Sequence, residues 1–243
     1  MAAADWFVPL ADPAAATAHV YALPQAGAGC TAFSACADLL APDVALWGLS
    51  LPGRQARFAE PSCTALPVLL DQLTPLVGRH RPWLMFGYCS GALLAFLLAR
   101  RLRAAGLPGP AALVIASYAA PDLTQSPSHL HTREPDEFWR EIIAYGGVPS
   151  AVAAQPDFRE IFEPALRADY ELLAGYDYTE DEPLDIPLTV LVGKQDPVLS
   201  APQVSAWRRH TSGPFRVRIL PGGHWLLDEA LPALAKVLRE HAP

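Results

Sequence analysis

The sequence lacks the features that attach proteins to membranes or to nucleic acid. Its 243 residues carry a formal net charge of −7, with 18 Lys and Arg against 25 Asp and Glu, so broad attraction to anionic lipid or nucleic acid is not expected. No continuous apolar span is long enough for a membrane helix. The first residues, MAAADWFVPLADP, have neither the basic start nor the apolar core of a signal peptide. These absences predict a cytoplasmic protein.

Cysteine is also scarce, and its four occurrences form no metal-binding pattern. The chain has no C-x-x-C pair and no histidine at metal-ligand spacing from a cysteine, which argues against zinc. Disulfides are disfavoured in a reducing compartment. Cys30, Cys36 and Cys63 are therefore expected to be small buried apolar side chains, and we expect neither a metal nor a dissociable cofactor. Cys89 has different surroundings.

Short apolar segments alternate with helix-like stretches along the chain. The apolar segments are rich in Val, Ile, Leu and aromatic residues and span 18–23, 44–49, 83–87, 112–118, 187–193 and 215–220. Such segments are typical of buried parallel strands. Helix-like stretches between them span 66–77, 91–105, 201–210 and 226–240. The alternation predicts one α/β domain with a mostly parallel, doubly wound sheet.

One interval, residues 121–186, shows no convincing strand. It contains helix-like stretches at 135–145 and 157–173, which predicts a helical lid inserted over the edge of the sheet. Its large side chains either line a pocket or hold the lid together, and they are Phe138, Trp139, Ile142, Tyr145, Tyr170, Leu173, Tyr176 and Tyr178.

The segment LMFGYCSGA, residues 84–92, has the pattern of a nucleophile elbow. Gly87 and Gly91 lie two positions on either side of Cys89, and small residues at these positions let a strand and a helix approach closely around a strained turn. The turn exposes its central side chain at the N-terminus of a helix. Cys89 is therefore the predicted nucleophile, and Ser90 is expected to contribute its backbone N–H.

Two later residues complete a predicted catalytic triad. Asp196 follows the apolar strand PLTVLVG, and His224 follows the strand FRVRIL within PGGHWLL. Nucleophile, acid and histidine thus occur in the chain order of α/β-hydrolases, each just after a predicted strand. The first strand leads into LPQAGAGC, residues 23–30, whose Ala26 N–H is predicted to form an oxyanion hole with the Ser90 N–H.

The same glycine-rich segment offers an alternative. Residues 27–32 fit G-x-G-x-x-A after a strand, the dinucleotide-binding pattern. That interpretation needs an acidic residue at the end of the next strand, but VALWGL continues into Ser50, Leu51 and Pro52. An NADP-binding variant would use Arg54 instead, so an oxidoreductase remains a minor alternative.

Several motifs together resemble the type II thioesterases of polyketide and nonribosomal peptide assembly lines. The similarity covers about residues 17–230 and rests on LPQAGAG, LSLPGRQARFAEP, FGYCSGALLAFLLARRLRAAGLPGP, RADYELLAGYDY, GKQDPVLS and GPFRVRILPGGHWLL. The resemblance implies an α/β-hydrolase fold of a single domain with a helical lid. It also implies an enzyme that removes acyl groups from the phosphopantetheine arm of carrier proteins.

Position by position, the resemblance assigns Cys89 as nucleophile, His224 as base and Asp196 as its orienting acid, with Ala26 and Ser90 as oxyanion donors. The chain departs from the family at three of its positions. Cys89 replaces the usual serine, Gln25 replaces the usual histidine before Ala-Gly, and Tyr88 stands where histidine is frequent. Gln25 and Tyr88 are therefore expected to contact substrate.

A cysteine nucleophile leaves the reaction outcome open. Serine converts a thioester into an oxygen ester, whereas cysteine forms a second thioester that stays activated toward water, an amine or another thiol. Hydrolysis is the expectation from the family, and transfer to an amine or a second carrier thiol is the alternative. A binding module without catalysis is a third possibility, which the presence of Asp196 and His224 disfavours.

The expected partners are an acyl or peptidyl carrier protein and a small-molecule acyl thioester, and the chain is expected to be a monomer. Such carriers are usually acidic, as this chain is, so docking would need local basic residues. The candidates are Arg54, Arg57, Arg100, Arg101, Arg103, Arg208 and Arg209, although each is also compatible with an ordinary solvated arginine.

Overall fold

The computed structural model describes residues 6–11, 14–80, 82–124, 129–148, 152 and 154–242, without the side chains of residues 145, 156 and 158. The pocket role expected for the Tyr145 side chain therefore lies outside the described residues. No helix in the described part of the chain is long and apolar enough to cross a bilayer.

A seven-stranded sheet in the order β1-β3-β2-β4-β5-β6-β7 forms the centre of the molecule. Its strands are β1 Phe7–Ala11, β2 Ala18–Leu23, β3 Val44–Leu49, β4 Trp83–Tyr88, β5 Leu113–Ala116, β6 Leu188–Gly193 and β7 Phe215–Leu220. All neighbours are parallel except β1, which pairs antiparallel with β3 at the edge. The predicted mostly parallel sheet is thus confirmed, with β1 as a strand that the apolar pattern does not predict.

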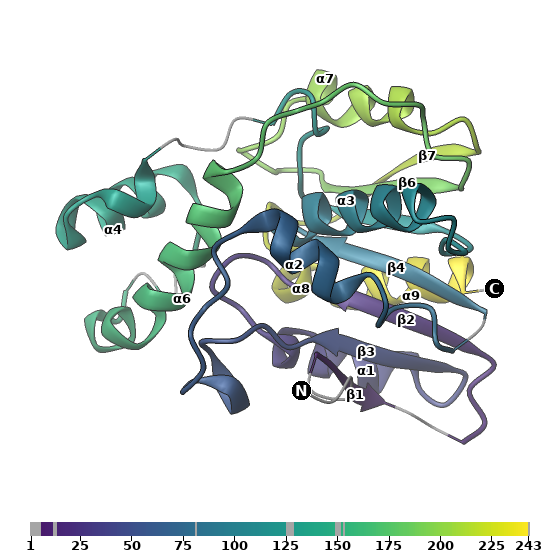
Figure 1. Ribbon diagram of the computed structural model, residues 1–243, viewed down its shortest axis with the longest axis horizontal. Coiled ribbons are helices and arrows are strands. Elements are labelled where there is room, and N and C mark those ends of the chain that lie inside the picture. Colours follow the sequence, from purple (N-terminus) through teal and green to yellow (C-terminus); the bar gives the residue numbers. More distant parts are fainter. Residues whose placement is uncertain are drawn as a thin grey trace.

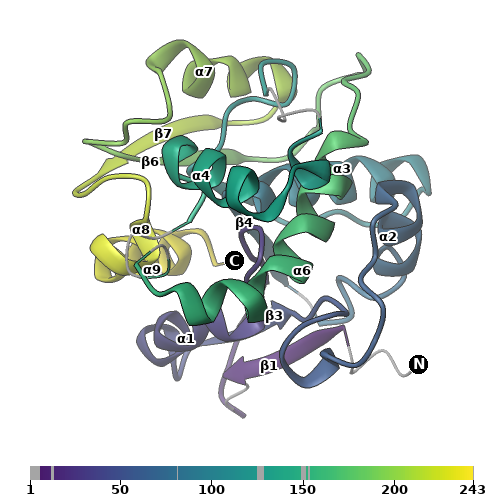
Figure 2. The ribbon, with the colours of Figure 1, turned by 90° about the vertical axis from the view of Figure 1, so that its left-hand side faces the viewer.

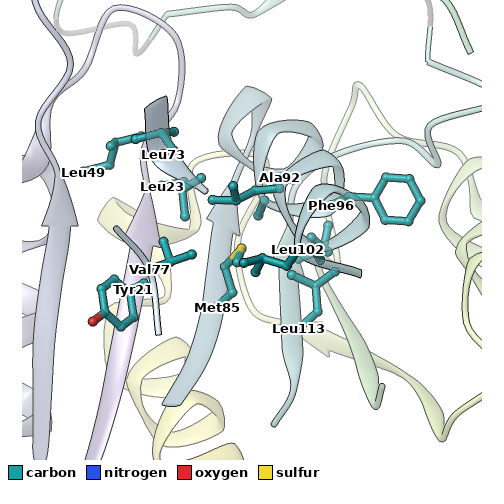
Figure 3. Packing of buried hydrophobic residues seen from close by; sticks show 14 of the residues in the cluster. Tyr21, Leu23, Leu49, Leu73, Val77, Met85, Ala92, Phe96, Leu102 and Leu113 are labelled. Atoms are coloured by element: carbon teal, nitrogen blue, oxygen red, sulfur yellow. The ribbon is translucent and has the colours of Figure 1, made fainter. Parts of the chain in front are cut away.

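Helices cover both faces of this sheet (Figure 1). They are α1 Ser34–Leu40, α2 Leu66–Leu73, α3 Ser90–Ala104, α7 Ala201–Ser205, α8 Leu226–Glu229 and α9 Leu231–His241. One apolar core lies between the sheet and α2 and α3, and the other between the sheet and α1, α8 and α9. In Figure 3 the side chain of Met85 on β4 points toward Leu102 on α3, both fully or almost fully buried. Burying side chains of this size contributes about 1.5 to 3 kcal/mol each, so these two layers fix the body of the fold.

Two further helices, α4 Pro135–Tyr145 and α6 Pro156–Ala174, lie between β5 and β6 in the sequence. Figure 1 shows them at one end of the sheet, and Figure 2, viewed from that end, shows them in front of it. Phe138, Trp139, Ile142 and Tyr170 form a separate small apolar cluster with Leu130 and Leu166. Most of these large side chains therefore pack the two helices against each other, which is the second of the two roles expected from the sequence.

Candidate active site

Cys89 occupies the turn between β4 and α3 with a strained backbone. Its φ is 50° and its ψ is −124°, a region that side-chain-bearing residues rarely adopt. The turn is held on both sides, because the Cys89 N–H donates to the Ala116 carbonyl at 2.8 Å and the Cys89 carbonyl accepts from the Ala92 N–H at 2.8 Å. This conformation presents the side chain at the carboxyl ends of the strands, as the sequence predicts.

The two glycines around Cys89 are required by the close approach of strand and helix. A Cβ on Gly87 would lie 2.5 Å from the Ala92 Cα, and a Cβ on Gly91 would lie 2.2 Å from the Leu23 carbonyl oxygen. Neither backbone atom is able to move without shifting α3 or β2. The spacing of the glycines around Cys89 is therefore a steric condition of the turn.

His224 and Asp196 meet on the loops that follow β7 and β6. The His224 Nδ1 lies 2.9 Å from the Asp196 Oδ2, and the two side chains are 8% and 1% exposed. The other carboxylate oxygen of Asp196 accepts backbone N–H groups from Val198 at 2.8 Å and Leu199 at 3.2 Å. Asp196 is thus fixed from one side and fixes the imidazole from the other.

The electrostatics of the site favour a protonated His224. Burial alone would lower its pKa, but hydrogen bonds to Asp196 and Cys89, together with the negative charge of both groups, outweigh burial and raise the pKa to about 10. Burial alone would raise the pKa of Asp196, but its hydrogen bond with His224 and the positive charge of that ring lower it. His224 is thus placed to exchange a proton with the neighbouring Cys89 side chain.

A cavity of about 680 Å³ lies beside Cys89. Ala26, Ser90 and His224 line it together with Cys89, and further wall residues include Ser117, Tyr118, Tyr170, Leu173, Val198 and Leu199. Ser90 is the first residue of α3, where backbone N–H groups have no partner within the helix. The structure thus brings the predicted nucleophile, base and both predicted oxyanion residues to one cavity, with Asp196 behind His224.

The sequence of residues 18–241 matches the family model of the thioesterase domain. The chain belongs to the thioesterase family. It is 30% identical over 229 residues to the gramicidin S biosynthesis protein GrsT of Aneurinibacillus migulanus, covering 93% of this chain and 89% of that protein. It is 34% identical to a probable cadicidin biosynthesis thioesterase of Streptomyces griseus, covering 96% of this chain and 64% of that longer protein.

Among solved structures, this thioesterase is similar to the type II thioesterase BorB from the borrelidin biosynthetic cluster. The TM-score is 0.87 at 32% sequence identity, and the match covers 97% of both chains. The α/β-hydrolase fold expected from the sequence is therefore established. The dinucleotide-binding alternative is wrong, because Gly27 packs against Leu166 of α6 and Arg54 is buried in an ion pair with Asp169.

Tyr88 of the thioesterase does not lie where the sequence predicts. It was expected to contact substrate, yet its side chain is fully buried in the core beneath the site and is absent from the cavity wall. Its hydroxyl donates to the His224 backbone carbonyl at 3.1 Å. Successive side chains of a strand point to opposite faces, and Tyr88, at the end of β4, points into the core. Tyr88 is therefore a positioning residue for His224.

Ser117 is a site residue that sequence reasoning missed. It follows β5 with a φ of 53°, and its hydroxyl donates to the His224 carbonyl at 2.9 Å, beside the Tyr88 hydroxyl. The available signal was a polar residue directly after the buried strand LVIA. Ser117 and Tyr88 together fix the backbone from which the His224 imidazole projects.

Gln25 lies next to the site but faces a second cavity of about 200 Å³, whose walls include Trp139, Phe162, Leu166 and Trp225. The two cavities share Ala26 and Gly147 in their walls. The Gln25 Oε1 is buried and has no hydrogen-bond partner among the described residues. Gln25 thus offers an unused acceptor beside an otherwise apolar space.

All seven arginines expected to dock a carrier protein have a partner within the chain. Arg54 and Arg57 are only 6% exposed and pair with Asp169 and Glu60, so the docking role is wrong for both. Partners of the others are Asp181 for Arg100 and Arg103, Asp71 for Arg101, the Thr211 carbonyl for Arg208 and Asp122 for Arg209. Arg101 and Arg209 remain more than half exposed, at 51% and 58%.

Proposed function

We propose that this thioesterase hydrolyses acyl thioesters carried on the phosphopantetheine arm of carrier proteins in polyketide or nonribosomal peptide biosynthesis, through an acyl-Cys89 intermediate. The observation that carries the proposal is the shared cavity of Cys89, His224, Ala26 and Ser90, with His224 hydrogen-bonded to Asp196. The biosynthetic setting is supported by relatives named for gramicidin S biosynthesis and the borrelidin cluster.

The reaction follows from the geometry in two halves. The Cys89 sulfur attacks the thioester carbonyl, and the carbonyl electrons move to oxygen, where the Ala26 and Ser90 N–H groups stabilise the charge. The tetrahedral intermediate collapses, the carbon–sulfur bond to pantetheine breaks, and His224 gives that sulfur its proton. His224 then takes a proton from water, and the resulting hydroxide attacks the acyl-Cys89 carbonyl. The carbon–sulfur bond to Cys89 breaks, which releases the carboxylic acid and returns Cys89 and His224 to their starting protonation states.

The charge on Cys89 changes the basicity of His224 between these halves. Hydrogen bonding to Cys89 and its negative charge are two of the causes that raise the pKa of His224. Acylation makes the sulfur neutral, so these two causes are lost and the imidazole gives up its proton more easily. His224 is thereby an acid when pantetheine leaves and a base when water attacks.

Transfer of the acyl group to an amine or a second carrier thiol is the alternative function, and the cysteine itself favours it. Exchange of one thioester for another is close to thermoneutral, so the acyl group on Cys89 keeps its reactivity. Hydrolysis and transfer share the first half-reaction and differ only in the acceptor that reaches the cavity.

We also propose that residues 121–186 act as a lid of a single α/β domain. This is supported by Tyr170 and Leu173 of α6, which line the cavity beside Cys89. Gln25 is proposed to bind the acyl chain of the substrate, and not the thioester group that reacts. Its Oε1 has no partner in the described part of the chain and would accept a hydrogen bond from a hydroxyl or N–H on an otherwise apolar acyl chain. The carrier protein is the proposed partner.

Intact-protein mass spectrometry with an acyl carrier protein as donor tests the nucleophile and the acceptor together. We expect wild type to gain the acyl mass and Cys89→Ala to gain none, whereas an adduct in Cys89→Ala would exclude Cys89. Amine and carrier-thiol acceptors are then offered in competition with water. Free acid as the only product at every acceptor concentration excludes transfer, and acceptor-dependent loss of free acid excludes hydrolysis as the main outcome. In the same assay, Gln25→Leu should slow hydroxylated acyl chains more than plain ones.

A further inference from the structure

A buried ion pair joins the inserted helix α6 to the loop after β3, beside the loop that carries Ala26. Arg54 contacts both carboxylate oxygens of Asp169, at 2.6 and 2.7 Å, and the two side chains are 7% and 8% exposed. Arg54 comes from the loop after β3, and Asp169 comes from α6. Because a buried pair of this kind restricts both partners to one geometry, α6 and the sheet are held in one relative position.

Both members of the pair also bind the backbone of the loop next to Ala26. The Gly27 N–H donates to the Asp169 Oδ2 at 2.7 Å, and the Arg54 guanidinium donates to the Ala28 carbonyl at 2.9 Å. The loop packs against α6 as well, since a Cβ on Gly27 would lie 2.9 Å from the Leu166 Cδ1. The ion pair therefore determines the path of the backbone on the C-terminal side of Ala26.

The loop itself is a tight turn closed by a backbone hydrogen bond. The Ala28 N–H donates to the Gln25 carbonyl at 3.1 Å and Gly27 has a φ of 76°, which together match a type II turn. In a trans peptide the N–H points opposite to the carbonyl, so the Gln25 carbonyl, held inside the turn, directs the Ala26 N–H out of it. The Asp169 carboxylate accepts the Gly27 N–H and so fixes the next peptide, Ala26–Gly27, which leaves Ala26 between two peptides that are each held by a hydrogen bond.

We propose that the Arg54–Asp169 pair is a positioning device that ties α6 to the turn at residues 25–28, so that the Ala26 N–H is directed into the catalytic cavity when α6 is seated on the sheet. This inference rests on the proposed function, because it needs Ala26 as an oxyanion donor. It makes the position of the inserted helix a condition for stabilising the tetrahedral intermediate. It also explains why a guanidinium and a carboxylate are buried in the middle of this region.

Two reagents that modify Cys89 in different ways test the proposal. Iodoacetamide alkylates a thiolate without forming an oxyanion, whereas a pantetheine trifluoromethyl ketone adds to the sulfur and places an oxyanion where Ala26 and Ser90 donate. Loss of one oxyanion donor typically costs about 100- to 1000-fold in rate. For Asp169→Asn we expect trifluoromethyl ketone affinity and kcat to fall about 10- to 100-fold, with KM and the iodoacetamide rate at Cys89 within about twofold.

A second variant controls for loss of folding in Asp169→Asn, because removing one partner alone leaves an unpaired buried charge. Arg54→Met combined with Asp169→Leu replaces the pair by apolar side chains of similar size, which buried pairs often tolerate. This double variant should stay folded and show the same loss of trifluoromethyl ketone affinity and kcat, with the iodoacetamide rate at Cys89 unchanged. Glu163→Gln is the matched control, since Glu163 pairs with Arg167 on the same helix at 2.8 Å. It should change neither the trifluoromethyl ketone affinity nor the iodoacetamide rate by more than about twofold.

The proposal would be overturned if Asp169→Asn and the apolar double variant lost reactivity toward iodoacetamide and affinity for the trifluoromethyl ketone to the same extent. It would also be overturned if neither variant lost either one. A loss of similar size in Glu163→Gln would overturn it as well. Wild type is measured in the same series, and absence of its Cys89 labelling would instead contradict the proposed function. The two failures are therefore distinguishable.

Discussion

At the scale of single residues, the proposed chemistry depends on how the charges of Cys89, His224 and Asp196 influence one another. The pKa of His224 is raised from 6.5 to about 10 by groups that include Cys89. A group with a raised folded-state pKa contributes its full stabilisation below the unfolded pKa and loses it as the pH rises through the folded pKa. The contribution of His224 to folding stability should therefore be complete below pH 6.5 and disappear by about pH 10.

Cys89→Ala removes two of the causes that raise the pKa of His224, and this makes a measurable prediction. We expect its imidazole to titrate about one pH unit or more lower than in wild type, as observed by nitrogen NMR of the ring. The loss of unfolding free energy with rising pH should still begin near pH 6.5 but should be smaller and end at a lower pH than in wild type. His210 serves as internal control, because its pKa is lowered by burial, against the effect of Asp122, and Cys89 is not among the causes. An unchanged titration of His224 would show that the sulfur does not influence it.

The sequence predicted the positions of these residues well where chain order determines them, and poorly where the orientation of a side chain determines them. Cys89, Asp196 and His224 each follow a predicted strand, so their meeting at one edge of the sheet follows from topology. Tyr88 precedes Cys89 in the same motif, but the direction of its side chain depends on the turn. The partners of Arg54 lie up to 115 residues away, and an arginine in a polar loop gives no sign of them.

At the scale of elements, the apolar pattern predicted six of the strands, but it predicted neither the edge strand β1 nor every helix boundary. β1 contains Pro9 and has only one buried residue, Phe7, so it lacks the continuous apolar run that marks the inner strands. The helix-like stretch 226–240 is divided into α8 and α9 around Ala230, with Pro232 in the first turn of α9. Proline is accepted at that position because no intrahelical N–H bond is lost there.

The packing of α3 against β2 predicts which glycine substitutions the fold tolerates. Gly91→Ala places a Cβ 2.2 Å from the Leu23 carbonyl oxygen, and we expect a loss of about 3 kcal/mol of unfolding free energy in urea denaturation. Gly109→Ala is the matched control, because its nearest neighbour is the Ile186 Cγ2 at 4.0 Å, and it should stay within about 0.5 kcal/mol of wild type. Similar losses for both variants would show that the approach of helix and strand is not what requires glycine.

At the scale of the whole molecule, a net charge of −7 would oppose the approach of the proposed partner, a carrier protein that is expected to be acidic as well. Docking then depends on local positive charge near the cavity. Arg209 is 58% exposed and pairs with Asp122 at 2.8 Å. Leu123, the residue after Asp122, lines the cavity beside Cys89, so Arg209 lies near that cavity. Arg101 is similarly exposed but pairs with Asp71 on α2 and belongs to the last turn of α3, the end opposite Cys89.

These two arginines give a matched test of carrier docking. Arg209→Gln should raise KM for an acyl carrier protein about two- to fivefold at low salt and leave a small acyl-pantetheine substrate unaffected, because only the carrier meets the surface around the cavity. Arg101→Gln should change neither value. The difference between the variants should shrink as salt screens surface charge over about 10 Å at 0.1 M. Equal effects of both substitutions would place the docking surface away from the cavity entrance, and an effect on the small substrate would mean that Arg209 acts on the cavity itself.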